Sequence, residues 1–543
     1  MIQRTIKIHP QDDLLVSLTD LKTGDVVYVD DEEFTILDNV PAKHKIASRD
    51  FAIDELLHLY GIVIGKAVCP IKKGQLISSL NTRHEAEPYR VRPTRYTWKK
   101  PDITKWKDLR FMGYPRSDGQ VGTRNFWLVI PLVFCENRNV DYIKNAFIKK
   151  LGYANPDKYE VLVEALVKGY KTGSENVIPR DLSPVVDRVF DNLDGIKFLT
   201  HNGGCGGTQE DSDNLCRLIA GYINNPNVAG ATVLSLGCQK AQIENLRQAI
   251  QHTNPNFDKP VLFFEQQKYT SEELLLRQAI METFSMLVAV NRITRTPASL
   301  DKLCIGLKCG GSDGFSGITA NPAMGYVSDI IAALKGKTML AEFPELCGVE
   351  QEIIDRSADT NVAEKFVRLM QAYNATAEAI GSGFSMNPSP GNIRDGLITD
   401  AMKSAGASKK GGTSPVEGVL EYGEYVKKSG LNLLCTPGHD VEATTGMAGS
   451  GANLIIFSTG LGTPTGNPIT PVIKTATNSK LNERLKDLID FDHGDIITKG
   501  KSIEQSGEEL LACIIKVASG LILTKSEQLH QDDFIPWKRG VSL

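Results

Sequence analysis

Residues that could bind a metal or an anion stand side by side in the segment KCGGSDG. They are Cys309, Gly310, Gly311, Ser312 and Asp313. The apolar run at 303–307 predicts a buried strand before them, and Asn321-Pro322 predicts a helix after them. Adjacent glycines let backbone N–H groups approach an anion, while the thiol and carboxylate offer a soft and a hard ligand, or a thiol and a base. A tight turn with a buried cysteine is the alternative.

Four further ionisable residues follow predicted strands in the middle of the chain. His201 and Cys205 follow one strand, Cys238 follows the next, and Glu265 follows a third. Strands that alternate with helices predict a mostly parallel sheet, whose ligands collect beyond the carboxyl ends of the strands. The pattern therefore indicates a shared site, although each isolated cysteine could instead be a buried apolar residue.

Cationic side chains that could hold a carboxylate or move a proton occur in several polar segments. They are His44, Arg49, Arg116, Arg124, Lys403 and His439. Arg116 and Arg124 share the loop at 111–125 and could grip a carboxylate bidentately, or they could fix a domain interface. His44 and Arg49 lie in a small β-rich module, where the alternative is a solvated face. Their role in a site requires that module to fold over the rest of the chain.

Composition excludes several classes of function. The 543 residues are 41% hydrophobic and 23% charged with a net charge of -4, which gives no basic excess for nucleic acid. No apolar run approaches the ~20 residues that span a bilayer. With no export signal, the ten cysteines predict reduced thiols in the cytoplasm rather than a disulfide framework. We find no P-loop, dinucleotide fingerprint, C-x-x-C pair or G-x-S-x-G elbow.

The predicted fold class is α/β. A small N-terminal β module at 1–86 precedes a linker at 87–107, which is rich in proline and cations. A larger catalytic body follows, in which we expect two parallel-sheet units, at 108–298 and 299–543. In both units, apolar strands run into loops of glycine, threonine and one ionisable residue.

An ordered set of motifs along nearly the whole chain resembles the altronate and galactarate dehydratase family of sugar-acid hydro-lyases. The segments are VPAKHKIASRD, DGQVGTRNF, HNGGCGG, VLSLGCQK, KCGGSDGFSGITANPAMG, NPSPGN, TPGHDVEATTG and TGLGTPTGNPITPVIK. The resemblance implies an N-terminal SAF-type β-clip module and a catalytic body that requires ferrous iron, with manganese or another divalent cation as the alternative.

The same resemblance implies a mechanism and a set of roles. A metal chelates the sugar-acid carboxylate and its C2 hydroxyl, a base removes the C2 proton, and an acid assists loss of the C3 hydroxyl. We expect His44, His439 and Lys403 to be catalytic. Substrate binding is expected from Arg49, Arg116, Arg124, Gly310, Gly311, Ser312 and Asp313. Metal ligands are expected from His201, Cys205, Cys238 and Cys309, with Asp313 and Glu265 as harder substitutes.

D-altronate is the favoured substrate, which would give 2-dehydro-3-deoxy-D-gluconate and water. Galactarate is the alternative, because the chain has enough arginines for a second carboxylate. A non-enzymatic sugar-acid-binding protein is a weaker alternative, because no DNA-binding helix pair is evident. A thiol redox enzyme is another, because no resolving cysteine lies close in sequence. Apart from the sugar acid, no nucleic-acid or membrane partner is expected, and homo-oligomer formation is left open.

Overall fold

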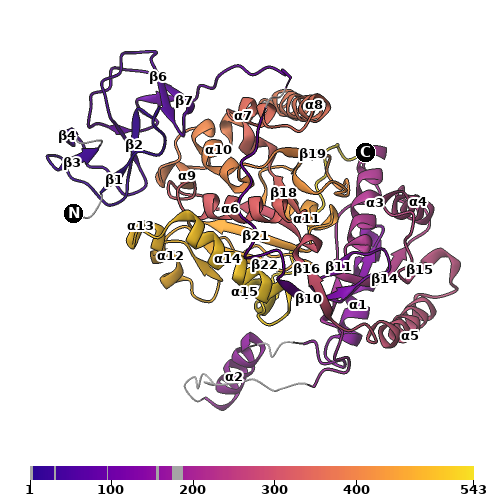
Figure 1. Cartoon of the computed structure of the whole chain (residues 1–543). Coiled ribbons are helices and arrows are strands. Elements are labelled where there is room, and N and C mark those ends of the chain that lie inside the picture. Colours follow the sequence, from indigo (N-terminus) through magenta and orange to yellow (C-terminus); the bar gives the residue numbers. More distant parts are fainter. Residues whose placement is uncertain (1–3, 30–31, 94–95, 155–157, 174–186) are drawn as a thin grey trace.

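A computed structural model describes residues 4–29, 32–93, 96–154, 158–173 and 187–543. Figure 1 shows a small β module at the N-terminus, a central α/β part built from the C-terminal half, and a second α/β part beside it. The predicted fold class, a β module followed by an α/β body with two parallel sheets, is confirmed. Within the described residues, no helix is long and apolar enough to cross a membrane.

The N-terminal module consists of short antiparallel strands. The order β1-β2-β5-β8 forms one sheet, β6-β7-β9 forms another, and β3 pairs with β4. The strands are β1 (Thr5–Ile6), β2 (Leu14–Ser17), β3 (Val26–Val29), β4 (Glu32–Thr35), β5 (Lys45–Ala47), β6 (Leu56–Leu59), β7 (Ile62–Ala67), β8 (Leu76–Ile77) and β9 (Thr82–Arg83). One apolar cluster of this module, around Leu14, Val16 and Leu57, continues into Phe315 and Met402 of the C-terminal part. The module is therefore packed onto the body through a shared core.

The second part is built on a four-stranded parallel sheet of order β13-β12-β14-β15. Its strands are β12 (Phe126–Pro131), β13 (Gly195–Phe198), β14 (Val228–Ser235) and β15 (Val261–Glu265). Its helices are α1 (Asn137–Phe147), α2 (Lys158–Thr172), α3 (Gln209–Asn224), α4 (Ile243–Thr253) and α5 (Glu272–Val290). Leu128 and Ile130 pack with α3 and α4, whereas Trp127 and Val129 pack with α1 and α5, so both faces of β12 are covered, as parallel sheets require.

The C-terminal part contains a seven-stranded parallel sheet of order β19-β20-β18-β17-β21-β22-β23. The strands are β17 (Cys304–Cys309), β18 (Lys337–Ala341), β19 (Val416–Leu420), β20 (Gly430–Leu434), β21 (Leu454–Thr459), β22 (Val472–Ala476) and β23 (Phe491–Asp492). The helices are α6 (Ala320–Ala333), α7 (Glu350–Asp355), α8 (Thr360–Glu378), α9 (Pro390–Arg394), α10 (Asp400–Ser408), α11 (Asp440–Gly449), α12 (Ser479–Arg484), α13 (Asp495–Thr498), α14 (Ile503–Ala518) and α15 (Lys525–Gln528). Helices α6 and α14 cover one face of the sheet and α11 covers the other. The central strand β17 is thus buried on both sides.

A small antiparallel sheet connects the two α/β parts. In it, β10 (Arg110–Pro115) pairs with both β11 (Val121–Gly122) and β16 (Thr296–Ser299). The predicted linker at 87–107 contains no helix or strand in its described residues, 87–93 and 96–107. It lies along the C-terminal part, where Tyr96 donates a hydrogen bond to the Thr413 carbonyl oxygen. The predicted boundaries at 86, 107 and 298 stay predictions.

A buried ion pair ties the two α/β parts together. The Arg124 guanidinium donates to both carboxylate oxygens of Glu527 on α15, at 2.6 and 2.9 Å. The Arg124 side chain is 1% exposed and that of Glu527 is 15% exposed. Arg124, predicted to bind substrate, is therefore occupied by an internal carboxylate.

Removing one partner of this pair should destabilise the fold. We expect Arg124→Met to lower the free energy of unfolding by about 3–5 kcal/mol, because Glu527 would keep a buried, uncompensated charge. Denaturant unfolding measures this. The matched control is Arg138→Met, which removes an exposed pair with Glu272 and should cost no more than about 1 kcal/mol. Equal losses in the two variants would contradict the prediction.

Candidate functional site

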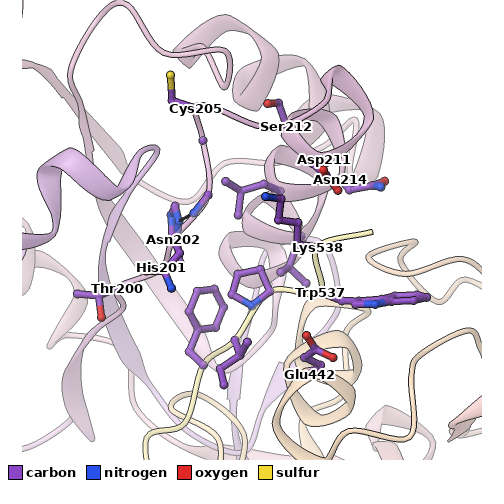
Figure 2. A pocket seen from close by; sticks show the side chains of 18 of the residues that line it. Thr200, His201, Asn202, Cys205, Asp211, Ser212, Asn214, Glu442, Trp537 and Lys538 are labelled. Carbon is purple, nitrogen blue, oxygen red and sulfur yellow. Dashed lines mark hydrogen bonds between the residues drawn. The ribbon is translucent and has the colours of Figure 1, made fainter. Parts of the chain in front are cut away.

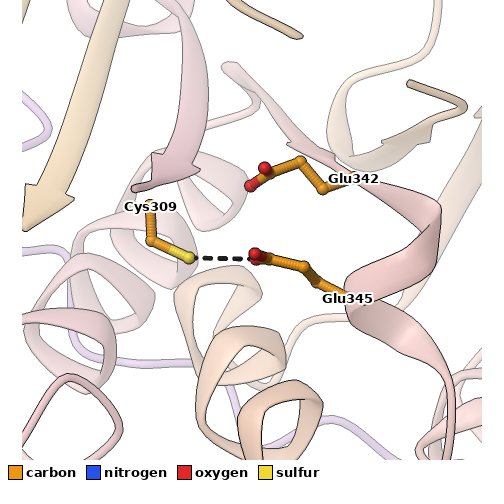
Figure 3. A group of neighbouring side chains, drawn as sticks. All are labelled: Cys309, Glu342 and Glu345. Carbon is orange, nitrogen blue, oxygen red and sulfur yellow. Dashed lines mark hydrogen bonds between the residues drawn. The ribbon is translucent and has the colours of Figure 1, made fainter. Parts of the chain in front are cut away.

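Three potential metal ligands meet at the carboxyl ends of β17 and β18. Cys309 ends β17, while Glu342 and Glu345 lie on the turn after β18, around the short 3-10 helix η4 (Phe343–Leu346). One ligand atom from each lies within 4.8 Å of the others, and all three residues are buried. Figure 3 shows the Cys309 thiol and both carboxylates pointing toward one another. Among the described residues, this is the one group of three that meets this spacing.

Three lysine ammonium groups surround these ligands. Lys308 Nζ lies 2.5 Å from Glu342 Oε1. Lys403 Nζ lies 3.0 Å from Glu345 Oε1. Lys410 Nζ lies 2.6 Å from the Cys309 sulfur and 3.5 Å from Glu345 Oε2. The site therefore combines metal ligands with cations that could neutralise an anionic substrate.

A third carboxylate balances the charge of this cluster. Asp440, at the first position of α11, lies 2.6 Å from Lys308 Nζ. A Cβ on Gly310 would lie 2.6 Å from both Asp440 Oδ1 and Phe457 Cζ, so a side chain at this position would require these neighbours to shift. Three ammonium groups thus face three carboxylates. That balance is what permits charges in a buried location.

Burial and neighbouring charges move the pKa values of the two glutamates in opposite directions. Burial, and then the Glu345 carboxylate, raise the pKa of Glu342. Burial also acts to raise the pKa of Glu345, but the ammonium groups of Lys403, Lys410 and Lys308 outweigh it and hold that pKa well below its usual range. Burial raises the pKa of the Cys309 thiol to about 12. Glu345 is consequently the firmly ionised member of the group.

The residues present fit a divalent cation. Glu342 Oε2 is buried and accepts no hydrogen bond, although Lys410 Nζ lies 3.6 Å away, so this oxygen has free acceptor capacity. Glu342 also adopts a left-handed backbone conformation with φ of 73°, which is uncommon for a residue with a side chain. One thiol and two carboxylates are ligands that a borderline metal such as iron(II) accepts.

The glycine loop after β17 contacts the N-terminal module. Lys43 Nζ lies 3.0 Å from Asp313 Oδ2 and 3.1 Å from Asp395 Oδ1. A Cβ on Gly314 would lie 2.2 Å from the Lys43 carbonyl oxygen, so the close approach requires glycine. His44, half-buried beside this contact, has a pKa lowered mainly by burial. The module therefore does fold over the body, next to Asp313.

Lys403 and His439 lie on other elements around the cluster. Lys403, on α10, also donates to Asn387 Oδ1 at 3.3 Å, and Asn387 donates to Asp400 at 3.1 Å. Burial raises the pKa of Asp400 to about 8. His439 is exposed, caps α11 by accepting a hydrogen bond from the Glu442 N–H, and precedes Asp440 directly. Both predicted residues thus adjoin the cluster.

Two of the predicted metal ligands, His201 and Cys205, line a different site. A cavity of about 490 Å³ lies between the second part, α11 and the C-terminal segment. Figure 2 shows His201 and Cys205 on one side of it, with Trp537 and Glu442 on another. His201 Nε2 donates to the Pro131 carbonyl oxygen at 2.7 Å, while Nδ1 accepts from the Gly203 N–H at 3.1 Å. Both ring nitrogens are occupied, so His201 has no lone pair free for a metal.

The remaining predicted residues do not join the Cys309 cluster. Arg116 donates to the Pro226 carbonyl and to Asn125, Arg49 pairs with Asp13 and Glu55, and Glu265 pairs with Lys268. The clustered residues that sequence analysis did not select are Lys308, Glu342, Glu345, Lys410 and Asp440. The signal for two of them was present, since the acidic segment Glu342-Phe343-Pro344-Glu345 follows a predicted strand.

Comparison with known proteins identifies the class of protein. Residues 3–85 match the altronate/galactarate dehydratase SAF domain, 113–291 match the second domain of D-galactarate dehydratase/altronate hydrolase, and 300–542 match the C-terminal D-galactarate/altronate dehydratase family model. These matches define a sugar-acid dehydratase, which is a hydro-lyase. The chain belongs to the altronate/galactarate dehydratase family, as the motifs indicated.

Individual relatives cover the whole chain. Altronate dehydratase of Escherichia coli (strain K12) is 33% identical over 541 residues, 99% of each chain. Altronate dehydratase of Bacillus subtilis (strain 168) is 32% identical over 539 residues, again 99% of each. Galactarate dehydratase (L-threo-forming) of Escherichia coli is 31% identical over 529 residues, 96% of this chain and 94% of the relative. The match thus extends along nearly the whole length of relatives whose names give two different substrates.

The buried state of His201 predicts a dependence of stability on pH. Burial lowers its pKa to about 4, below the unfolded value of about 6.5. Between these values the unfolded chain binds more protons, so the free energy of unfolding should fall as the pH falls through this window, by up to about 1.4 kcal/mol per pH unit. His201→Gln should have a shallower slope than the unmodified chain in denaturant unfolding from pH 7 to 4. Parallel curves would show that His201 is not the cause.

Proposed function

We propose that this enzyme dehydrates D-altronate to 2-dehydro-3-deoxy-D-gluconate and water. The observation that carries the proposal is the buried group of Cys309, Glu342 and Glu345 among three lysines. Such a site can hold a cation and the carboxylate of a sugar acid in one place, away from water. We further propose that the reaction takes place in the cytoplasm, which agrees with ten cysteines that are all free.

Cys309, Glu342 and Glu345 would hold a divalent cation, ferrous iron before manganese. When bound, the metal would supply Lewis-acid polarisation of the substrate's oxygens. Binding would require the Cys309 thiol to lose its proton, and the Lys410 ammonium group, 2.6 Å from the sulfur, would stabilise the resulting thiolate. The ligand set proposed for this metal therefore retains Cys309 from the predicted ligands and replaces the others with two glutamates.

The lysines and histidines would perform the proton chemistry. The ammonium groups of Lys308, Lys403 and Lys410, together with the charge of a bound cation, would stabilise the substrate carboxylate and the enediolate that forms when the C2 proton leaves. His44, kept neutral by its lowered pKa, accepts that proton. His439 protonates the C3 hydroxyl, which departs as water, and the resulting enol takes a proton at C3 and becomes the 2-keto acid.

Charge accounting supports a substrate with one carboxylate. A hexarate such as galactarate needs a second cationic clamp, for which Arg49, Arg116 and Arg124 were the predicted source. Arg49 and Arg124 pair with carboxylates of the protein itself, while Arg116 donates to a backbone carbonyl and an amide oxygen. The lysines around Cys309 are also paired with protein carboxylates, but a divalent cation held there would add positive charge at this one place, which suits the single carboxylate of a hexonate. Galactarate is retained as the alternative substrate.

Anaerobic turnover with added ferrous ion tests both the substrate and the metal. We expect formation of the 2-keto-3-deoxy acid from altronate and not from galactarate, and loss of turnover after chelation. Cys309→Ser should lower kcat by at least about 10²-fold, whereas Cys304→Ser, at the other end of the same strand, should retain it. Product from galactarate alone would overturn the substrate. Binding of altronate without turnover under every metal condition would favour a sugar-acid-binding protein.

The acid–base assignment has its own test. His44→Gln and His439→Gln should each lower kcat by about 10²–10⁴-fold, since each removes one proton transfer. Circular dichroism checks that both variants fold. The matched control is His252→Gln, at the end of α4, which should leave kcat unchanged. Full activity in either of the first two variants would remove that histidine from the mechanism.

A further inference from the structure

Three cysteines follow three neighbouring strands of the second parallel sheet. Cys135 lies in the short 3-10 helix η1 (Phe134–Glu136) after β12, Cys205 lies in the glycine loop after β13, and Cys238 lies in the loop after β14. The sheet order places β12 between β13 and β14, and all three strands are parallel. The three thiols therefore belong to adjacent loops at one edge of the sheet, where α/β proteins bind ligands.

Backbone contacts hold these loops together. The Phe134 N–H donates to the Gly203 carbonyl oxygen at 3.1 Å, which joins the Cys135 loop to the Cys205 loop. The Ala241 N–H donates to the Gly204 carbonyl oxygen at 3.1 Å, and Lys240 Nζ donates to the Gly207 carbonyl oxygen at 2.7 Å. The Cys205 loop is thus fastened on both sides, with Cys135 and Cys238 on its neighbours.

Glycines beside the thiols make this proximity possible. Gly204 has φ of 96°, and a Cβ there would lie 2.0 Å from the Leu132 carbonyl oxygen. Gly237, just before Cys238, has φ of 120°, and its Cβ would lie 2.6 Å from Gln267 Oε1. Residues with side chains would separate the loops. The glycines therefore let three thiol-bearing loops converge.

The exposure of these thiols distinguishes them from the other cysteines of the α/β body. Cys135, Cys205 and Cys238 are exposed, whereas the others are buried or intermediate, namely Cys216, Cys304, Cys309, Cys347, Cys435 and Cys513. Free cysteine is among the most buried residue types, and thiols are conspicuous ligands for soft metals. Three exposed thiols on adjacent loops at one sheet edge are therefore available as ligands.

We propose that Cys135, Cys205 and Cys238 hold an iron–sulfur cluster at this edge of the second sheet. A single zinc ion, with Zn–S bonds of about 2.3 Å, would need its sulfur ligands within about 4 Å of one another. Among the described residues, the ligand atoms of the Cys309 group all lie within 4.8 Å of one another. The sulfur atoms of Cys135, Cys205 and Cys238 do not meet this spacing. A larger inorganic core, whose irons each take one thiolate, accepts thiols that lie farther apart than the ligands of a single zinc ion.

Three thiolates would leave one iron of a four-iron cluster without a protein ligand. His201 cannot fill that position, because both of its ring nitrogens are hydrogen-bonded. The cavity of about 490 Å³ in Figure 2 has the Cys205 loop as one wall and Glu442 and Lys538 among its other lining residues. The cluster would thus adjoin, through the Cys205 loop, a space large enough for a small polar ligand.

Anaerobic reconstitution of the full-length chain with ferrous iron and sulfide tests the proposal. We expect a broad visible absorption band of thiolate-bound iron–sulfur and about four acid-labile sulfide per chain, with about four iron in the cluster and one more at the Cys309 site. Cys135→Ser, Cys205→Ser and Cys238→Ser should each reduce the bound sulfide to less than half. The control Cys69→Ser, an exposed cysteine of the N-terminal module, should bind the full amount. Because the readout is spectroscopic, its failure is separate from failure of the altronate assignment.

Alkylation of the unmodified chain gives a second measurement that needs no variant. In the reconstituted protein, mass spectrometry should find Cys135, Cys205 and Cys238 protected from iodoacetamide and Cys69 labelled, whereas the apo protein should be labelled at all four. The proposal would be overturned by any of three results. These are no bound sulfide, equal sulfide binding by the serine variants, or one zinc ion per chain that prevents cluster formation.

Discussion

Charge neutrality in a buried place is the constraint on which the rest of the C-terminal part depends. Lys308, Lys403 and Lys410 carry three ammonium groups at the carboxyl ends of β17 and β18, where an unpaired charge would cost several kcal/mol. Glu342, Glu345 and Asp440 supply the matching carboxylates. Since each of these six comes from a different point of the chain, the strands, the left-handed turn at Glu342 and the start of α11 must all be correctly placed.

The N-terminal module and the C-terminal segment are fixed to the body by contacts of different kinds. The module shares an apolar core with α10 and places Lys43 on Asp313. The C-terminal segment crosses to the second part, where the Arg539 and Gly540 N–H groups donate to Asp211. Each attachment borders one of the two candidate sites.

Two parallel sheets in one chain provide two edges for ligands, and their chemistry differs. The edge at Cys309 is buried and rich in paired charges, which suits an anion and a hard or borderline cation. The edge at Cys205 is exposed and bears thiols and glycines. This division explains why a single predicted ligand set of His201, Cys205, Cys238 and Cys309 does not assemble. Its members belong to different sheets.

The sequence by itself determined the fold class and the order of strands and loops, because periodicity and turn residues are local signals. Its ordered motifs carried the resemblance to the family. It also indicated that strand ends carry the chemistry. Only the tertiary structure decided which strand ends meet. It brought Glu342, Glu345 and Lys410 to Cys309, and it paired Arg124 with Glu527, 403 residues away. Contacts between distant residues depend on sheet order and on balancing buried charge, and neither is encoded in local spacing.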